Sequence, residues 1–268
     1  MIERTYHTQK GDIHYWINAV DPSQSTLVFL PGLTADHRLF EKQIDFFAGK
    51  YNVFVWDAPG HGASRPFALN FSLMDKVEWL HAILIHENIS QPVLVGQSMG
   101  GYVSQCYMQR YPGEVRAFVS IDSAPLKRCY MTGWEIWLLK HCELMYRCYP
   151  WKLLIESGSK GCATTDYGRA LMRSMMQSYT PREYSRLAGH GFRILGEAIE
   201  ADLPYQIDCP CLLLCGEKDQ AGSAKRYNRQ WTKKEGLPLV WIKAAGHNAN
   251  TDAPDTVNRL IQEFIAAQ

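Results

Sequence analysis

One serine of the chain lies in a glycine-rich segment typical of a nucleophile held in a sharp turn. Ser98 is the centre of Gly96-Gln97-Ser98-Met99-Gly100, and an apolar run at residues 91–95 precedes it. A strand that turns at once into a helix leaves no room for side chains at the flanking glycines. The segment therefore predicts a strand, a strained turn and a helix over 102–111, with the Ser98 hydroxyl exposed for attack.

Two further residues have the types needed to activate such a serine. Asp219 follows an apolar run at residues 211–215, and His247 follows another at 239–242. A histidine can take the proton of a serine and pass it to a leaving group, and a carboxylate can fix the imidazole tautomer and stabilise its charged form. All three candidate residues stand where predicted strands end.

The chain resembles the α/β-hydrolase superfamily, in particular its serine esterase and lipase-like branch with a helical cap. The serine turn is the first shared motif, and the two strand-end loops with Asp219 and His247 together form the second. The others are residues 29–33, FLPGL, and residues 57–64, DAPGHGAS. The four motifs extend over nearly the whole chain, and the resemblance implies a catalytic triad in the order Ser98, Asp219, His247.

The resemblance also implies an oxyanion hole made of two backbone N–H groups. One belongs to Leu33, in the loop after the third strand, and the other to Met99, which follows the nucleophile. Pro31-Gly32 stands where many family members have His-Gly. A hydrogen bond that this histidine often makes is therefore missing here.

Other residues compete for these roles. Asp122 also follows a predicted strand, and some family members carry the triad acid there, but Gly216-Glu217-Lys218-Asp219 matches the usual loop and favours Asp219. Asp252 is close to His247 in sequence and is expected to cap the last helix.

Two histidines and one glutamine near these motifs have other expected roles. His61 is expected to stabilise a turn, and His190 either contacts substrate or faces solvent. Gln97 either makes a hydrogen bond near the serine or simply tolerates its position.

Strands and helices are predicted to alternate around these motifs. Apolar runs indicate strands near residues 12–18, 26–30, 52–56, 92–96, 116–121, 210–215 and 238–242. Apolar residues at helical spacing follow Ser72, a good N-cap, and recur over 257–265. The pattern indicates an α/β protein with the α/β-hydrolase fold, in which helices cover both faces of a mostly parallel central sheet.

The alternation stops between Pro125 and Leu203, where the sequence indicates several helices and no strand. In the family that the chain resembles, a helical cap is inserted here over the active site. We therefore expect a core domain of residues 1–125 and 203–268 and a cap of residues 126–202. Part of the cap should form an apolar wall of the substrate pocket, although the sequence does not say which side chains do so. The candidates are Met131, Trp134, Trp137, Leu138, Met145, Tyr146, Trp151, Met172, Met175 and Met176.

Composition and charge restrict the partners. The chain has 268 residues, of which 46% are hydrophobic, enough for one large domain with an insertion. The net charge is +1 with scattered Lys and Arg, which disfavours nucleic acid or a membrane surface as the main partner. The N-terminus has no apolar signal core and no run reaches membrane-spanning length, so we expect a cytoplasmic protein without membrane insertion.

The eight cysteines and the glycine-rich motifs indicate no cofactor. The cysteines lack C-x-x-C spacing, which favours reduced thiols over disulfides or zinc ligands. No P-loop, dinucleotide-binding glycine pattern or zinc-type histidine pair occurs. We therefore predict neither a cofactor nor a metal.

The motifs and the resemblance together predict a serine hydrolase that cleaves a small or medium-sized carboxylic ester through an acyl-enzyme intermediate. Hydrolysis of a lactone, thioester, amide or carbon–carbon bond remains open on the same fold. A receptor that binds a small molecule without catalysis is a further alternative. A halide-displacing enzyme is disfavoured because its nucleophile would be an aspartate at position 98.

Overall fold

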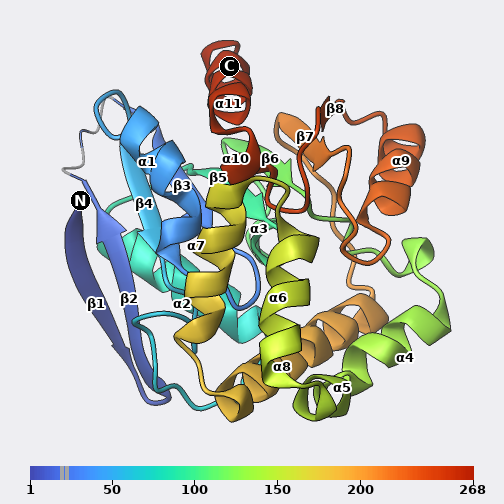
Figure 1. Cartoon of the computed structure of the whole chain (residues 1–268). Helices are drawn as coiled ribbons and strands as arrows, with labels where there is room; N and C mark the ends of the chain where they lie inside the picture. The colour runs from blue at the N-terminus through green and yellow to red at the C-terminus, as the bar shows by residue number, and fades with distance from the viewer. Residues whose placement is uncertain (19–20, 22–23) are drawn as a thin grey trace.

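The computed structural model describes residues 1–18, 21 and 24–268, and an eight-stranded sheet forms its centre (Figure 1). The strand order is β1-β2-β4-β3-β5-β6-β7-β8. Only the β1–β2 and β2–β4 pairs are antiparallel. The strands are β1 (Ile2–Thr8), β2 (Gly11–Ile17), β3 (Thr26–Leu30), β4 (Asn52–Trp56), β5 (Val93–Gln97), β6 (Ala117–Ile121), β7 (Cys211–Gly216) and β8 (Leu239–Ile242). The predicted mostly parallel sheet is confirmed.

The edge strand β1 was not predicted. Its sequence, IERTYHT, is mostly exposed and contains no apolar run, yet it pairs with β2 along its whole length, from Ile2 opposite Ile17 to Thr8 opposite Gly11. An edge strand that buries little surface needs no hydrophobic run, so its sequence carries only a weak signal.

Helices cover both faces of the sheet, as predicted. Leu94 of β5 packs in a cluster with residues of α2, α3 and α9, whereas its neighbours Val93 and Val95 pack with residues of α1 and α11. This alternation follows from the two-residue period of a strand. The helices are α1 (Glu41–Phe47), α2 (Leu73–His86), α3 (Met99–Arg110), α9 (Ala224–Glu235), α10 (Ala249–Asp252) and α11 (Pro254–Ala266), with single turns η1 (His37–Phe40) and η2 (Arg128–Tyr130).

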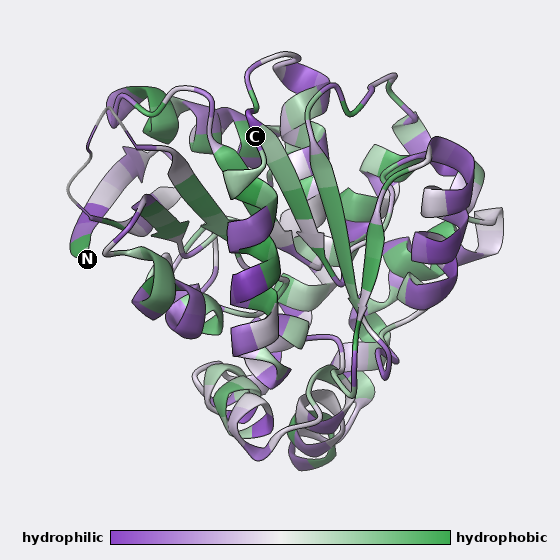
Figure 2. Cartoon of the chain, turned by 90° about the horizontal axis from the view of Figure 1, so that it is seen from above, coloured by the Kyte–Doolittle hydropathy of each residue, from purple (hydrophilic) through white to green (hydrophobic). Residues whose placement is uncertain are grey.

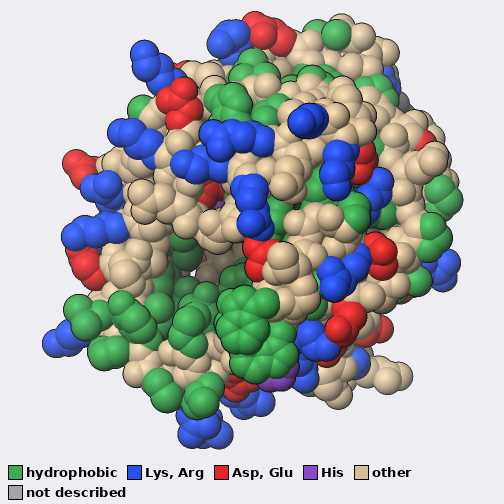
Figure 3. Space-filling view, turned by 90° about the vertical axis from the view of Figure 1, so that its right-hand side faces the viewer, with side chains coloured by type: hydrophobic (Ala, Val, Ile, Leu, Met, Phe, Trp, Pro, Cys, Tyr) green, Lys and Arg blue, Asp and Glu red, His purple; other side chains and the backbone are tan. Residues whose placement is uncertain are grey.

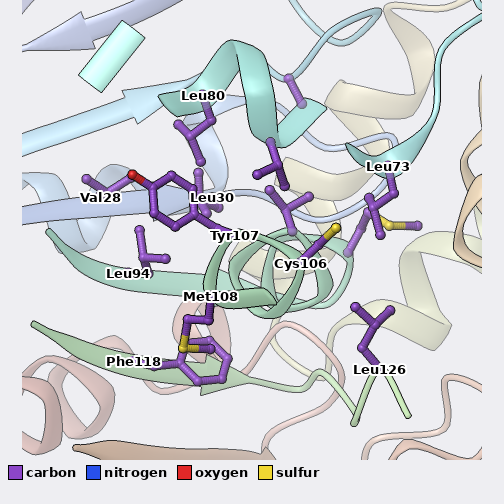
Figure 4. Close-up of a cluster of buried hydrophobic side chains, with 14 of the residues drawn as sticks. Val28, Leu30, Leu73, Leu80, Leu94, Cys106, Tyr107, Met108, Phe118 and Leu126 are labelled. Atoms are coloured by element: carbon purple, nitrogen blue, oxygen red, sulfur yellow. The ribbon is translucent and has the colours of Figure 1, made fainter. Parts of the chain in front are cut away.

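The layered arrangement is visible from above, where apolar strands lie between helices whose outer sides are more polar (Figure 2). Leu94 and Phe118 pair on the neighbouring strands β5 and β6 and belong to the same cluster as Tyr107 and Met108 of α3 (Figure 4). Burial of these side chains anchors α3 on the sheet, and with it the turn at Ser98 that precedes the helix.

Five helices separate β6 from β7. They are α4 (Gly133–His141), α5 (Glu143–Cys148), α6 (Trp151–Cys162), α7 (Asp166–Gln177) and α8 (Pro181–Ala201). The long helix α8 packs against α4 and α5, and α6 packs against α7. Figure 1 shows α4, α5 and α8 together at the bottom of the view, beyond the sheet. None of the helices in the described ranges combines the length and apolar character that crossing a membrane would require.

Candidate active site

Ser98 occupies the turn between β5 and α3 with a backbone that few non-glycine residues adopt, φ 50° and ψ −114°. A Cβ atom at Gly96 would collide with the backbone of Gly100, and one at Gly100 would collide with the carbonyl oxygen of Leu30. The sharp turn therefore depends on both glycines, as predicted. Helix α3 begins at Met99, three residues before the predicted start.

The three residues of the predicted triad lie in one hydrogen-bonded chain. Ser98 Oγ is 2.8 Å from His247 Nε2, and His247 Nδ1 is 3.0 Å from Asp219 Oδ2. With a proton on Nδ1 donated to the Asp219 carboxylate, the Nε2 lone pair accepts the Ser98 hydroxyl proton. Asp219 is buried and the His247 side chain is 12% exposed. Such an arrangement can deliver a serine alkoxide to a carbonyl carbon.

The ionisation of His247 is governed by the carboxylates near it. Burial lowers the pKa of the imidazole, but the charge of Asp219 and its hydrogen bond raise it, and Asp122 adds to that effect. The balance is a raised pKa, so the site favours the imidazolium that forms when the serine gives up its proton.

Gln97 connects the serine turn to the histidine loop. Its Nε2 atom donates to the carbonyl oxygen of His247 at 2.8 Å and to Asn248 Oδ1 at 3.2 Å. Of the two roles expected for Gln97, the hydrogen bond is therefore the one observed. It fixes the backbone of the base relative to the nucleophile.

Asp122 does not hydrogen-bond the His247 ring but joins the two loops that carry the acid and the base. Its buried carboxylate accepts from Gly216 N at 2.6 Å and from Ala249 N at 2.9 Å. Burial raises the pKa of Asp122 well above its ordinary value, and the charge of Asp219 raises it further. The acid that touches the histidine is Asp219.

The two predicted oxyanion-hole residues line the same cavity as Ser98. Met99 is the first residue of α3, so its N–H has no acceptor within the helix. Leu33 lies in the loop after β3, and this loop contacts the serine turn: a Cβ atom at Gly32 would stand 3.2 Å from Ser98 Cβ. Both residues thus lie near the nucleophile, and the oxyanion hole formed by their N–H groups stays a prediction.

Ser98 opens into a cavity of about 190 Å³ with a mostly apolar lining. Helices α5 to α8 contribute Tyr146, Gly158, Cys162, Met172, Tyr184, Ala188, Phe192 and Leu195. The core side contributes Gly32, Leu33, Thr34, Ala35, Gln97, Ser98, Met99, Tyr102, Ala221, His247 and Asn248. Among these described residues there is no Lys, Arg, Asp or Glu, so the cavity wall offers no counter-ion to a charged substrate group.

Of the ten candidates for the apolar wall, Tyr146 and Met172 line the cavity and the other eight do not. Trp134, Trp137 and Met145 are 64%, 48% and 57% exposed, and Met175 is fully buried among other core side chains. The helices turn different faces to the cavity, and α8 uses the stripe Tyr184, Ala188, Phe192 and Leu195. These positions have helical spacing. The sequence does not show, however, which face of a helix lies toward Ser98, because the two are distant in the chain.

Asp252 and His190 differ from expectation, whereas His61 does not. Asp252 does not cap the last helix; its carboxylate accepts from Thr164 N, Thr165 N and Gly246 N, so it joins the start of α7 to the histidine loop. His61 is buried in its turn with Nδ1 3.1 Å from Pro59 O, which fits the expected role. His190 neither faces solvent nor lines the cavity, because it is buried against the Phe71 ring.

Two groups of potential metal ligands occur in the described chain, and hydrogen bonds already occupy both. Asp57 accepts from His37 and Ala63, next to an Asp36 paired with Arg38. The second group is Asp122, Cys215 and Asp219, whose carboxylates hold the loops described above.

Comparison with known proteins supports the assignment of the fold. A family model described as the alpha/beta hydrolase fold matches residues 25–254. The (E)-2-((N-methylformamido)methylene)succinate hydrolase of Acinetobacter baylyi is 24% identical over 245 residues, which cover 89% of each chain.

Solved structures agree with this match. An enol-lactonase from Burkholderia xenovorans LB400 has a TM-score of 0.77 at 19% identity, over 98% of this chain and 100% of that one. A hydrolase from Pseudomonas aeruginosa PA01 has a TM-score of 0.80 at 16% identity, over 98% of both chains. Identities this low show a shared fold and no more, whereas the family model covers most of the sequence. The chain therefore belongs to the alpha/beta hydrolase fold family.

Proposed function

We propose that the protein is a cofactor-independent serine hydrolase that cleaves small or medium-sized carboxylic esters. The observation that carries this proposal is the hydrogen-bonded chain from Ser98 through His247 to Asp219, with the serine on a strained turn in a cavity that Leu33 and Met99 also line. These are the parts that acyl transfer to a serine requires.

The reaction runs in two halves. Ser98 Oγ attacks the ester carbonyl while His247 Nε2 takes its proton, and the N–H groups of Leu33 and Met99 stabilise the negative oxygen of the tetrahedral intermediate. His247 then protonates the departing alcohol, which leaves an acyl group on Ser98. Water, deprotonated by His247, then attacks the acyl carbonyl. The bond to Ser98 Oγ breaks as His247 returns the proton to this oxygen, and the carboxylic acid leaves. Asp219 holds the imidazole in the required tautomer throughout.

We propose that residues 126–202 form a cap and that residues 1–125 and 203–268 form the core. Eight of the cavity-lining residues come from α5 to α8, so this segment provides much of the wall around the acyl group. The cap thus excludes bulk water and selects the substrate, while the core carries the chemistry.

The uncharged lining defines the substrate class further. The name of the Acinetobacter relative describes a succinate derivative, which carries carboxylate groups. Burying a carboxylate is costly without a cation beside it, and the described wall of this cavity contains no Lys or Arg and offers only uncharged hydrogen-bonding groups such as those of Thr34 and Tyr184. We therefore propose an uncharged ester of a monocarboxylic acid.

We propose the cytoplasm as the compartment of the protein. All eight cysteines are free, which fits its reducing environment.

Covalent labelling tests the proposal. A fluorophosphonate should label the wild-type protein on Ser98, and p-nitrophenyl acetate should be hydrolysed with a burst of p-nitrophenol as the acyl-enzyme forms. The Ser98→Ala variant serves as the control. A folded wild-type protein that neither reacts with the probe nor turns over any activated ester would instead support the non-catalytic receptor.

A further inference from the structure

A large apolar surface covers the outer side of the inserted helices. Most of the strongly exposed large hydrophobic side chains described in the chain come from α4, α5 and the start of α6. They are Trp134, Trp137, Leu138, Leu144, Met145, Tyr149 and Leu153, each between 44% and 66% exposed. We call these seven residues the outer face. In Figure 3 such side chains gather in the lower part of the molecule, beneath a hollow.

Packing inside the protein does not explain the outer face. Helix α4 buries Ile136 and leaves Trp134 and Trp137 stacked on each other at 4.8 Å between ring centroids. Helix α5 directs Tyr146 into the cavity of Ser98 and leaves Leu144 and Met145 exposed. Contiguous exposed apolar side chains of this size mark a surface that binds something.

The charges on α4, α5 and α6 that lack an ion-pair partner among the described residues are mainly positive. Arg147 and Lys152 are exposed, and neither makes an ion pair with any residue that the structure describes. Lys140 and Lys160, on the same helices, are paired with Glu200 and Glu156. One acid on these helices, Glu143, likewise makes no ion pair with a described residue, and its side-chain stem lies against Gly189 of α8.

This combination of groups selects the occupant. Trp, Tyr and aliphatic side chains flanked by Lys and Arg suit the boundary between lipid headgroups and acyl chains. A second copy of the chain suits the face less well, because each copy would bring two unpaired cations, Arg147 and Lys152, and only one unpaired acid, Glu143, so like charges would be in surplus between them. The chemistry is complementary to an apolar surface with negative charge.

We propose that the outer face adsorbs the protein peripherally to anionic lipid surfaces, without a membrane-spanning segment. Helix α5 carries Leu144 and Met145 of the outer face as well as Tyr146 of the cavity. Adsorption therefore places the cavity wall next to the lipid. If the ester hydrolase proposed above is correct, amphiphilic esters could then reach Ser98 directly from the lipid. The adsorption itself does not depend on catalysis.

Vesicle co-sedimentation tests the proposal with full-length Ser98→Ala protein, so that hydrolysis does not alter the lipid. Vesicles of equimolar phosphatidylcholine and phosphatidylglycerol should retain the protein, and its tryptophan emission should shift to the blue. Replacing Trp137, Leu144 and Met145 together by Ser should weaken binding at least about tenfold. Ile85→Ser, which changes an exposed apolar residue on α2, should leave binding unchanged.

Charge variants provide the second arm. Arg147→Glu with Lys152→Glu should weaken binding to the anionic vesicles and not to pure phosphatidylcholine vesicles, whereas Lys243→Glu, next to β8, should change neither. Absence of sedimentation by a folded protein, or equal loss in the Ile85→Ser variant, would overturn the proposal. A dimer detected by analytical ultracentrifugation and abolished by the triple Ser variant, without vesicle binding, would identify a second copy as the occupant. Ester turnover by wild type is measured separately and tests only the hydrolase function.

Discussion

At the scale of single residues, the proposed chemistry depends most on Ser98. Its Oγ atom is the only part of the hydrogen-bonded chain that can form the acyl bond, and it stands 2.8 Å from the base. Ser98→Ala should lower kcat about 10⁶-fold while the melting temperature stays close to that of wild type. Steady-state hydrolysis of p-nitrophenyl acetate and calorimetry measure both. Retention of more than a few per cent of the activity would place the nucleophile elsewhere.

Two carboxylates differ in their contacts and should differ in their effects. Asp219 contacts the imidazole, so Asp219→Asn should lower acylation by as much as about 10⁴-fold. Asp122 accepts two backbone N–H bonds, and an Asn side chain can satisfy only one, so Asp122→Asn should cost about 1–3 kcal/mol of stability with a much smaller loss of rate.

Single-turnover acylation and urea unfolding of both variants separate these effects. A crippled Asp122→Asn beside a near-normal Asp219→Asn would show that the acid is misassigned. If both are crippled, the two carboxylates share the role.

The pKa of His247 determines the acid limb of the pH profile. The base works only when neutral, so activity should fall as pH drops through this pKa, which the charges of Asp219 and Asp122 raise against the effect of burial. Asp219→Asn removes the carboxylate that raises the pKa of His247 more. The variant should therefore move the acid limb of kcat/KM to lower pH, in addition to lowering the plateau. Glu217→Gln, in the same loop but exposed, is the matched control. An unmoved limb in Asp219→Asn would mean that another group titrates there.

At the scale of elements, helix α8 should control acyl-chain preference. Phe192 lies on its cavity-lining stripe, and Phe192→Ala adds room for the acyl group. The variant should favour longer p-nitrophenyl esters, with each additional buried methylene contributing about 0.8 kcal/mol to transition-state binding. Trp137→Ala, on the exposed side of α4, should leave the profile with soluble esters unchanged. Identical chain-length profiles for Phe192→Ala and wild type would place the acyl site away from α8.

At the scale of the whole molecule, the active site forms where the carboxyl ends of the parallel strands meet the inserted helices. Ser98, Asp122 and Asp219 follow β5, β6 and β7 within three residues, and His247 follows β8 after a slightly longer loop. Such a strand edge is the usual position of a site in an open α/β sheet. The inserted helices contribute uncharged side chains to the wall of the cavity there.

The uncharged cavity wall leads to a prediction about the charge of the acyl group that the site accepts. Phenyl butyrate and monophenyl succinate have acyl groups of similar size, but the second would bury a carboxylate without a cationic partner. We expect kcat/KM for the succinate ester to be lower by about 10²-fold or more. Comparable values for the two esters at neutral pH would show that the acyl group stays in contact with water or that an unassigned cation reaches it.

The sequence by itself determined the local features of this protein. The serine turn was predictable because Gly96 and Gly100 are required by close backbone contacts, and the parallel strands were predictable because burial on both faces demands continuous apolar runs. The positions of Asp219 and His247 at strand ends brought them together as expected. The exposed edge strand β1 lacked such a run and escaped prediction.

Only the tertiary structure decided which side chains face the site. A helix in the inserted segment can turn any of several apolar faces inward, and the choice depends on packing against partners distant in sequence. Thus Phe192 lines the cavity and Trp137 faces outward, although both are aromatic residues of helices. For the same reason, the long-range contacts of Asp122 and Asp252 with backbone N–H groups could not be predicted from their neighbours in the chain.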